Sequence, residues 1–221
     1  LKGMTVGGKP FILKNGVKDI IDALEKVIRD NNGEILTETP AREITIEDST
    51  AKGIVAEREG EELEIEAKMV ISNVGPKMTI RLGREDNFDR AYLKEVVERV
   101  RAAAGIDYMI TTERPLLEPS TVLFTADTQR LECFVSERTS DGKFVLRTAS
   151  VPPSTILYSP KKEYETFLQD LKETFPDFER CGGRILIARN FYGEWPFYRT
   201  WPGDCIGTKT SVENLYNVGD G

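Results

Sequence analysis

The sequence predicts a two-lobe α/β fold with some α+β character, and three patterns support this prediction. An amphipathic helix near the N-terminus precedes short strands in which apolar and charged residues alternate. Two continuous apolar runs, MVI at 69–71 and LYNV at 215–218, are typical of buried strands. Residues 106–151 hold several strand-like segments separated by Pro, Asp and Gly, which indicates an antiparallel sheet in a second lobe.

The first helix is predicted over VKDIIDALEKVIRDNN, residues 17–32. Its valines, isoleucines and leucine recur at spacings of three and four residues and make one apolar stripe. Asn15 and Gly16 provide a start signal, and Asn32 followed by Gly33 provides a stop signal.

Short strands are expected after this helix, because apolar residues alternate with charged ones as in half-exposed antiparallel strands. EREGEE, residues 57–62, is the predicted hairpin turn between two of them. The MVI run ends in Asn73, Gly75 and Pro76, and we expect it to be buried on both faces and to share a sheet with LYNV. The predicted strands are GEILTE (33–38), AREITIED (41–48), AKGIVAERE (51–59), ELEIEAK (62–68) and MVISNV (69–74).

The second lobe is predicted to combine helices with an antiparallel sheet. One helix is expected over 88–104, and another over 159–178 with Ser159 as its N-cap and Pro160 at its first position. A further strand begins near Arg184 and leads into an aromatic-rich loop. The strands of the sheet are expected at 106–113, 121–126, 131–138 and 143–151.

Composition excludes several classes of function. With 30 Lys and Arg against 37 Asp and Glu, the net charge is −7, and no basic run is long enough to follow a nucleic acid backbone. No apolar stretch approaches the ~18 residues of a membrane span, which leaves peripheral membrane contact open. Three widely spaced cysteines suggest neither a disulfide framework nor a zinc site, and they fit a reducing cytoplasm.

The sequence contains no histidine. This absence removes the Ser-His-Asp and Cys-His nucleophile systems, the usual zinc sites and the commonest general base at neutral pH. If the chain belongs to an enzyme, we expect a cofactor to carry the chemistry, with no metal site and no catalytic base that the sequence identifies.

Four segments carry a resemblance to a known family: GGKPFILKNGVKDIIDALEKVIRDNNGEILTETPAREI, AKGIVAE, ELEIEAKMVISNVGP and NLYNVGD. Together they resemble the middle and end of the FAD-dependent amine oxidase and phytoene desaturase superfamily. That superfamily has a Pro-x-Gly-Gly loop, a helix, a Gly-Gly turn and, late in the chain, a strand ending in Gly-Asp. The Ser-Asn-x-x-Pro pattern at 72–76 resembles its phytoene desaturase and carotenoid isomerase side more than its amine oxidase side.

The resemblance implies a set of FAD-binding residues. Asn15 and Gly16 stand where the family usually has Gly-Gly, and Ala41 stands at the position whose backbone would hold the adenine. The family's G-x-G-x-x-G loop, which recognises the dinucleotide phosphates, does not occur in these 221 residues. We therefore expect this chain alone to bind FAD poorly or not at all. The implied cofactor-binding residues are Asn15, Gly16, Ala41, Asn73, Gly219 and Asp220.

An aromatic segment, RNFYGEWPFYRTWPG, precedes the Gly-Asp strand. It is either a cluster that covers the junction of two lobes or a wall of the substrate cavity. In the family this segment lies close to the flavin, and aromatic walls suit a lipophilic or planar substrate. The candidate substrate-binding residues are Trp195, Phe197, Tyr198 and Trp201.

The resemblance divides the chain into an incomplete FAD/NAD(P)-binding, Rossmann-like lobe at 17–76 and 214–221 and a substrate-binding lobe at 1–16 and 77–213. It implies a flavin-dependent oxidoreductase that transfers a hydride from a lipophilic or amine substrate to FAD. The alternative is a non-catalytic substrate-binding or partner-binding module derived from the same fold. The residues do not separate desaturase, isomerase and amine oxidase, and they identify neither the substrate nor the oligomeric state.

Overall fold

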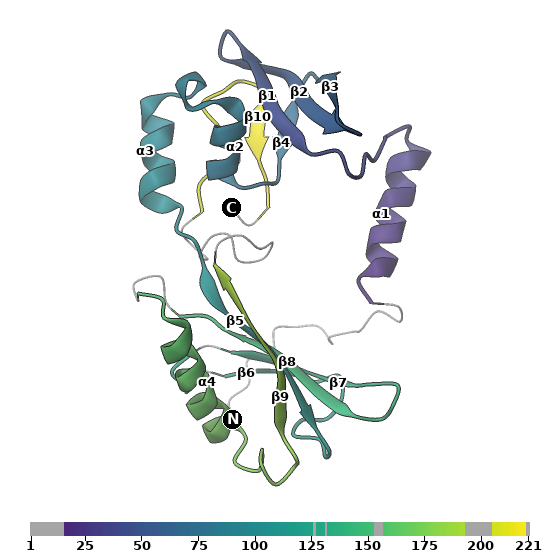
Figure 1. Cartoon of the computed structure of the whole chain (residues 1–221), viewed down its shortest axis with the longest axis vertical. Coiled ribbons are helices and arrows are strands. Elements are labelled where there is room, and N and C mark those ends of the chain that lie inside the picture. The colour runs from purple at the N-terminus through teal and green to yellow at the C-terminus, as the bar shows by residue number, and fades with distance from the viewer. Residues whose placement is uncertain (1–15, 126, 131, 153–156, 193–204, 220–221) are drawn as a thin grey trace. The chain divides into compact units, whose positions relative to one another are not determined.

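The structure is a computed structural model that describes residues 16–125, 127–130, 132–152, 157–192 and 205–219. The chain divides into two compact units (Figure 1). Within the described residues, the meander unit comprises 20–102 and 205–219, and the five-stranded unit comprises 16–19 and 103–192. Each unit has its own hydrophobic core.

The meander unit contains three antiparallel strands, β1 (Ala41–Glu47), β2 (Thr50–Arg58) and β3 (Glu61–Glu66). Two-residue turns join them at Asp48–Ser49 and at Glu59–Gly60. All four of these turn residues have positive φ, as in the type I′ turns whose twist matches that of the strands. The second turn confirms the hairpin predicted at 57–62.

A second, parallel pair of strands lies in the same unit. β4 (Val70–Ser72) pairs with β10 (Leu215–Asn217), which confirms that the two apolar runs share a sheet. Three short helical segments follow β4, and Figure 1 shows α2 and α3 beside this strand pair. They are α2 (Pro76–Gly83), the 3₁₀ segment η1 (Glu85–Asn87) and α3 (Arg90–Arg99).

The core of the meander unit joins segments that are far apart in the sequence. Leu215 from β10 packs with Ile44 from β1 and with Val96 from α3, and each is at most 3% exposed. Phe88 and Tyr92 stack there with ring centroids 5.7 Å apart. The ends of β4 and β10 are therefore anchored on buried side chains.

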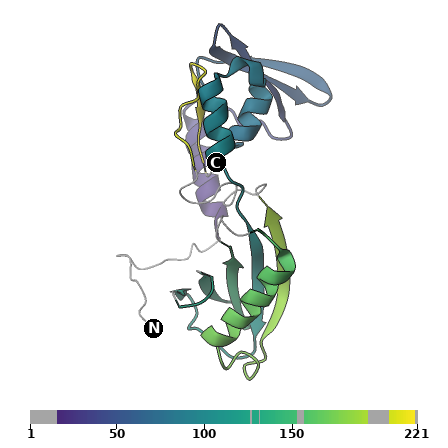
Figure 2. The same cartoon turned by 90° about the vertical axis from the view of Figure 1, so that its left-hand side faces the viewer.

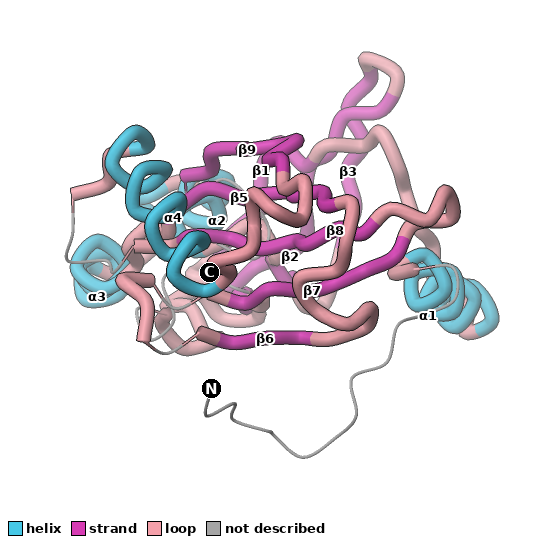
Figure 3. The backbone as a smooth tube through the Cα atoms, turned by 90° about the horizontal axis from the view of Figure 1, so that it is seen from below, coloured by secondary structure: helices cyan, strands magenta, loops and turns pink. Residues whose placement is uncertain are grey.

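The five-stranded unit is an antiparallel sheet with one helix against it. Figure 3 shows its strands side by side, with β9 and β6 as the outer strands. The order is β6-β7-β8-β5-β9, and the strands are β5 (Ala104–Thr112), β6 (Val122–Phe124), β7 (Cys133–Arg138), β8 (Phe144–Ser150) and β9 (Arg184–Tyr192). These strands confirm the antiparallel sheet predicted for the second lobe.

Helix α4 (Pro160–Thr174) lies along this sheet and packs against β5 and β8 (Figure 2). Its position confirms the predicted helix with Ser159 as N-cap residue and Pro160 at the first turn. Phe167 of α4 is fully buried and stacks on Tyr108 of β5, with ring centroids 3.6 Å apart. Phe134 of β7 meets Phe175 edge-on at 5.1 Å. Aromatic contacts therefore form much of this core.

Helix α1 (Lys18–Asp30) confirms the first predicted helix, and none of its residues is buried. Its apolar stripe is exposed, with Leu24 at 59% and Val27 at 58%. Helices of this kind are normally stabilised by packing of the apolar face. The stripe has no such packing within the described residues.

Three sequence predictions differ from the structure. Residues 33–38 are not a strand, because no described strand pairs with them and Glu38 has a φ of 53°. β4 is not buried on both faces: Ile71 is 60% exposed, since among the described residues β4 pairs with β10 alone and nothing covers the face that carries Ile71. The helix predicted over 88–104 is shorter, because Val100 is already extended and Ala104 begins β5.

Both lobes are therefore α/β in character, and the fold class predicted from the sequence is confirmed. The compact division places α2 and α3 with β1–β4, whereas the sequence assigned residues 77–213 to a substrate lobe. Which unit contacts a cofactor and which a substrate stays a prediction. In the part of the chain that the structure describes, no helix has the length and apolar character needed to cross a bilayer.

Candidate functional site at the carboxyl edge of β4 and β10

The two parallel strands of the meander unit end side by side. Val70, Ile71 and Ser72 stand opposite Leu215, Tyr216 and Asn217 in order. The Val218 N–H donates to the Ser72 carbonyl at 2.9 Å, so the pairing continues just past the strand ends. In open α/β sheets, ligands bind outside the carboxyl ends of parallel strands. This edge is therefore the first place to look for a binding site.

Asn73 and Gly219, the residues just beyond this edge, are in close contact. A Cβ atom at position 219 would overlap the Asn73 Oδ1 atom, and Gly219 has a φ of 96°. Both observations require glycine, because L-residues with a side chain rarely adopt that backbone conformation. The structure thus brings together two of the residues that the resemblance assigned to FAD.

Helix α2 starts at the same edge. Gly75 is its N-cap residue with a φ of 84°, and Pro76 occupies the first turn. Because the N-cap residue is a glycine, it has no side chain of its own to cap this helix end. The aligned peptide dipoles leave partial positive charge at a helix N-terminus, which favours a negatively charged ligand. The feature adds to the strand ends but would not define a site alone.

A buried chain of hydrogen bonds holds this edge in place. Ser72 Oγ and Thr79 Oγ1 lie 2.7 Å apart, and Thr79 Oγ1 lies 2.8 Å from Asn217 Oδ1. The Asn217 amide donates in turn to the Tyr92 hydroxyl at 2.7 Å. β4, α2, β10 and α3 are thereby connected through side chains that are all at most 8% exposed.

Burial of this hydrogen-bond network favours a single arrangement of its side chains. Thr79 and Asn217 are 0% and 3% exposed, so their polar atoms have no bulk water to replace a lost partner. An unsatisfied buried polar group costs about 1–3 kcal/mol. Burial raises the pKa of Tyr92, which keeps its hydroxyl neutral. The network therefore fixes the two strand ends relative to α2.

The other residues assigned from the sequence fall in three groups. Gly16 is exposed ahead of α1 with a φ of 74°, and nothing lies near the Cβ position it lacks. Ala41 is the exposed first residue of β1 and pairs with Ala56. The remaining assigned residues lie outside the described part of the chain: Asn15, Trp195, Phe197, Tyr198, Trp201 and Asp220.

Sequence reasoning missed the positioning residues Thr79, Tyr92 and Asn217. One signal was present for Asn217, because an asparagine inside an apolar strand must find buried partners. Thr79 and Tyr92 lie on short helices whose contacts with β4 and β10 depend on the tertiary fold. Nothing in their local sequence distinguishes them from ordinary core residues.

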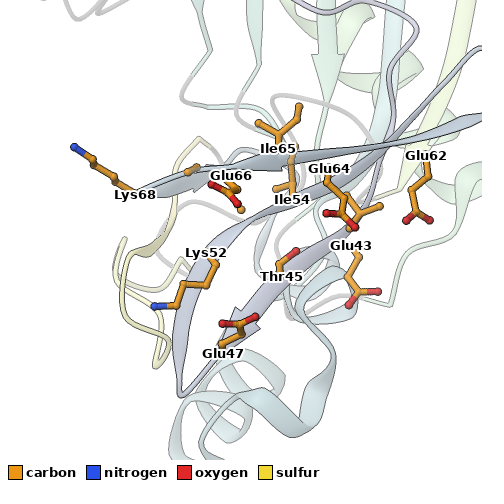
Figure 4. A pocket seen from close by; sticks show the side chains of 13 residues that line it. Glu43, Thr45, Glu47, Lys52, Ile54, Glu62, Glu64, Ile65, Glu66 and Lys68 are labelled. Atoms are coloured by element: carbon orange, nitrogen blue, oxygen red, sulfur yellow. The ribbon is translucent and has the colours of Figure 1, made fainter.

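A pocket of about 860 Å³ lies elsewhere, on a face of the β1–β3 meander (Figure 4). Its charged residues come from all three strands and from just beyond β3. Acidic residues outnumber basic ones, so a negatively charged dinucleotide would be repelled. This pocket is therefore a poor cofactor site. The charged side chains are Glu43, Glu47, Lys52, Glu62, Glu64, Glu66 and Lys68.

The carboxyl edge fits one part of a dinucleotide site. The missing side chain at Gly219 makes room for the Asn73 side chain beside its backbone, and the Asn73 amide is a group that can both donate and accept hydrogen bonds. Together with the start of α2, these groups suit the phosphates and hydroxyls of a nucleotide cofactor.

Proteins of known structure share the fold of this chain. No family model matches this chain. It is 31% identical to an oxidoreductase from Methanosarcina mazei of known structure, with a TM-score of 0.74, covering 93% of this chain and 49% of that one. It is 24% identical over 217 residues to the uncharacterized protein MJ1488 of Methanocaldococcus jannaschii, covering 97% of this chain and 50% of that protein.

A more distant likeness extends to a flavoenzyme. The myxobacterial chondrochloren halogenase CndH, a variant of the FAD-dependent halogenases, matches with a TM-score of 0.54 and 12% identity. That match covers 91% of this chain and 44% of the halogenase, and it bears on the fold alone. The chain thus spans about half the length of the proteins it resembles.

Proposed function

We propose that this chain is part of a flavin-dependent oxidoreductase. The observation that carries the proposal is the 31% identity and shared fold with an oxidoreductase over 93% of the chain. The carboxyl edge of β4 and β10 supports it independently, because two residues assigned to FAD from sequence resemblance, Asn73 and Gly219, meet there. The choice of FAD rests on the sequence resemblance, and the FAD-dependent halogenase supports the fold.

In this proposal, FAD would supply the chemistry when bound, namely the capacity to accept a hydride from a substrate C–H bond. Gly219 makes room for the Asn73 side chain beside its backbone, and Asn73 would hold a hydroxyl or phosphate oxygen of the cofactor there. The start of α2 stabilises negative charge. Thr79, Tyr92 and Asn217 act as positioning residues, because their hydrogen bonds fix the strand ends that place Asn73 and Gly219.

We also propose that further polypeptide completes the cofactor lobe. The apolar stripe of α1 is exposed, and the outward face of β4 presents Ile71 at 60% exposure. A two-stranded parallel sheet is rarely left uncovered. The relatives are about twice as long as this chain, which is room enough for more strands and for a phosphate-binding glycine loop. The 221 residues alone would then bind FAD weakly.

The proposed substrate is a small molecule that is either lipophilic or an amine. With no histidine in the sequence, the protein's part is to orient the substrate and exclude water rather than to supply a strong base. We assign the wall of the substrate cavity to Trp195, Phe197, Tyr198 and Trp201, because aromatic side chains can hold a substrate against a flavin ring.

The test uses the product of the complete reading frame that contains this chain, loaded with FAD and kept without oxygen. Candidate lipophilic alkenes and amines are added separately, and the flavin absorbance is followed. The proposal expects one class to bleach the flavin and the other not. Bleaching by amines with release of peroxide in air would place the protein with amine oxidases. No bleaching by either class, in a protein that retains FAD, would contradict the proposed substrates.

A non-catalytic binding module is the second candidate. It is favoured by the fact that the described residues hold only two parallel strands and no G-x-G-x-x-G loop. A module would use the five-stranded sheet to bind a small molecule or a partner without redox chemistry. A complete reading frame with no G-x-G-x-x-G segment, whose product retains no FAD, would favour this candidate.

A further inference from the structure

A cluster of acidic side chains is buried in the five-stranded unit, between α4 and the sheet. Glu163 and Asp170 come from α4 and are 3% and 0% exposed. Glu132 lies just before β7 and is 1% exposed. Carboxyl groups are seldom buried so completely unless each has a partner. The partners of the three side chains therefore decide what the cluster does.

Two of the three are fully engaged. Arg130 Nε and Nη2 donate to the two oxygens of Glu163 at 2.8 and 2.9 Å. Ser150 Oγ donates to the same carboxylate at 2.5 Å. Asp170 accepts hydrogen bonds from the backbone N–H groups of residues 129 and 130 at 3.0 and 3.1 Å. Both carboxyl groups therefore have hydrogen-bond donors on their oxygens.

Glu132 is different, because neither of its carboxyl oxygens has a hydrogen-bond partner among the described residues. Its backbone is fixed, with its N–H donating to Thr125 Oγ1 and its carbonyl accepting from the Thr125 N–H, both at 3.0 Å. The Tyr108 hydroxyl of β5 also lacks a partner there. The side chain is therefore held in a dry site without a donor for its charge.

The charged groups around Glu132 do not offset the cost of ionising its buried carboxyl group. Asp170 and Glu163 face it from α4, and both make its ionisation less favourable. Arg130 acts in the opposite direction but is already bound to Glu163. Burial and the two neighbouring anions together raise the pKa of Glu132 to about 8 from its ordinary 4.5. A metal ion is a poor alternative, since no group of three such ligands among the described residues could hold one.

We propose that Glu132 holds a proton in the native state and that losing this proton loosens the packing of α4 on the sheet. The protonated acid is neutral and tolerates its dry surroundings. The ionised form places a third negative charge beside Glu163 and Asp170, and the simplest relief is to move α4 away so that water reaches the carboxylate. The five-stranded unit therefore responds to pH on the alkaline side of neutrality.

The direction of the effect follows from the raised pKa. Between pH 4.5 and about 8 the native state binds a proton that the unfolded state has released, so stability falls as pH rises through this range. Below that range the stabilisation is fully present. Across it, the folding equilibrium constant of this unit should fall roughly 10³-fold. The pKa of Tyr108 is also raised by burial, so its hydroxyl stays neutral throughout.

Hydrogen exchange of the whole 221-residue chain tests this directly. Peptides that cover α4 and β5 are followed at pH about 6 and about 8.5, with rates corrected for the intrinsic pH dependence of exchange. In the wild type, the protection of α4 should fall roughly 70-fold between these values. In Glu132→Gln, a neutral side chain of the same shape, protection should hardly change with pH.

Glu165→Gln is the matched control, because Glu165 lies on the exposed side of the same helix. This variant should keep the wild-type pH dependence. The proposal is overturned if Glu132→Gln loses protection with pH as the wild type does, or if wild-type protection is the same at both pH values. The proposal is also overturned if added Mg²⁺ or Na⁺ increases the exchange protection of the wild type but not that of Glu132→Gln, because Glu132 would then belong to a cation site.

Discussion

Thr79→Val should destabilise the meander unit far more than Thr79→Ser, because the hydroxyl at this position matters more than the methyl. Thr79 is 0% exposed, and its Oγ1 lies 2.7 Å from Ser72 Oγ and 2.8 Å from Asn217 Oδ1. Valine keeps the shape but leaves both partners unsatisfied, at about 1–3 kcal/mol each, less some relaxation. We expect a loss of about 2–4 kcal/mol.

Serine at position 79 keeps the hydrogen bonds and removes one buried methyl group, which costs about 1 kcal/mol. Urea denaturation of both variants, followed by circular dichroism, gives the free energies of unfolding at an unchanged m-value. Hydrogen exchange in α3, which the network reaches through Tyr92, localises the effect. The reasoning fails if the serine variant is the less stable of the two, because packing and not hydrogen bonding would then hold the strand ends.

Three further predictions concern the site, the acidic cluster and the core. Gly219→Ala should weaken FAD binding by the complete protein about tenfold or more, because alanine disfavours a φ of 96° and its Cβ would displace Asn73. Quenching of flavin fluorescence measures the affinity. An unchanged affinity would mean that Gly219 is not part of the site. From pH 5 to pH 9 the wild type should lose about 3–5 kcal/mol of unfolding free energy relative to Glu132→Gln. Urea denaturation of both proteins at each pH measures this difference. A difference that stays the same at both pH values would mean that Glu132 ionises normally in the native state. Phe134→Ala should lower the free energy of unfolding by about 3–5 kcal/mol and Leu157→Ala by less than about 0.5, since Phe134 is 0% and Leu157 is 94% exposed. Thermal melts compare the two variants. Melting curves that coincide would mean that the core lies elsewhere.

Local patterns in the sequence predicted most of the elements correctly. The three- and four-residue spacing of apolar side chains identified α1, and the alternation of apolar and charged residues identified β1, β2 and β3. These signals suffice because each depends on neighbours within one element. That β4 and β10 share a sheet was also predicted, since both are apolar runs that end in polar and glycine residues, whereas their parallel pairing is shown by the structure.

The errors arise where tertiary neighbours decide the outcome. Residues 33–38 have strand-like composition but no neighbouring strand to pair with. The apolar run of β4 suggested complete burial, yet burial depends on what covers each face. Helix α2 was missed because eight residues carry too little periodicity to identify a helix, although Pro76 at its start was a usable signal.

For the candidate site, the resemblance assigned both Asn73 and Gly219 to the cofactor, and both follow recognisable strands. The structure brings the two residues into contact, and their role at a cofactor stays a prediction. It could not identify Thr79, Tyr92 and Asn217, which meet only through the packing of α2, α3 and β10. The burial of Glu132 could not be predicted from the sequence either, since glutamate in a strand-rich segment is usually exposed. Only the fold shows that its carboxyl group lies in a dry site.

Flavin retention tests the central proposal most directly. The product of the complete reading frame is incubated with FAD and desalted, and its absorbance near ~450 nm, where oxidised flavin absorbs, is compared with that of the 221-residue chain treated identically. Our account predicts close to one bound FAD per complete protein and little on the chain alone. A complete protein that emerges colourless would contradict the flavoenzyme assignment and leave the shared fold as evidence of ancestry only.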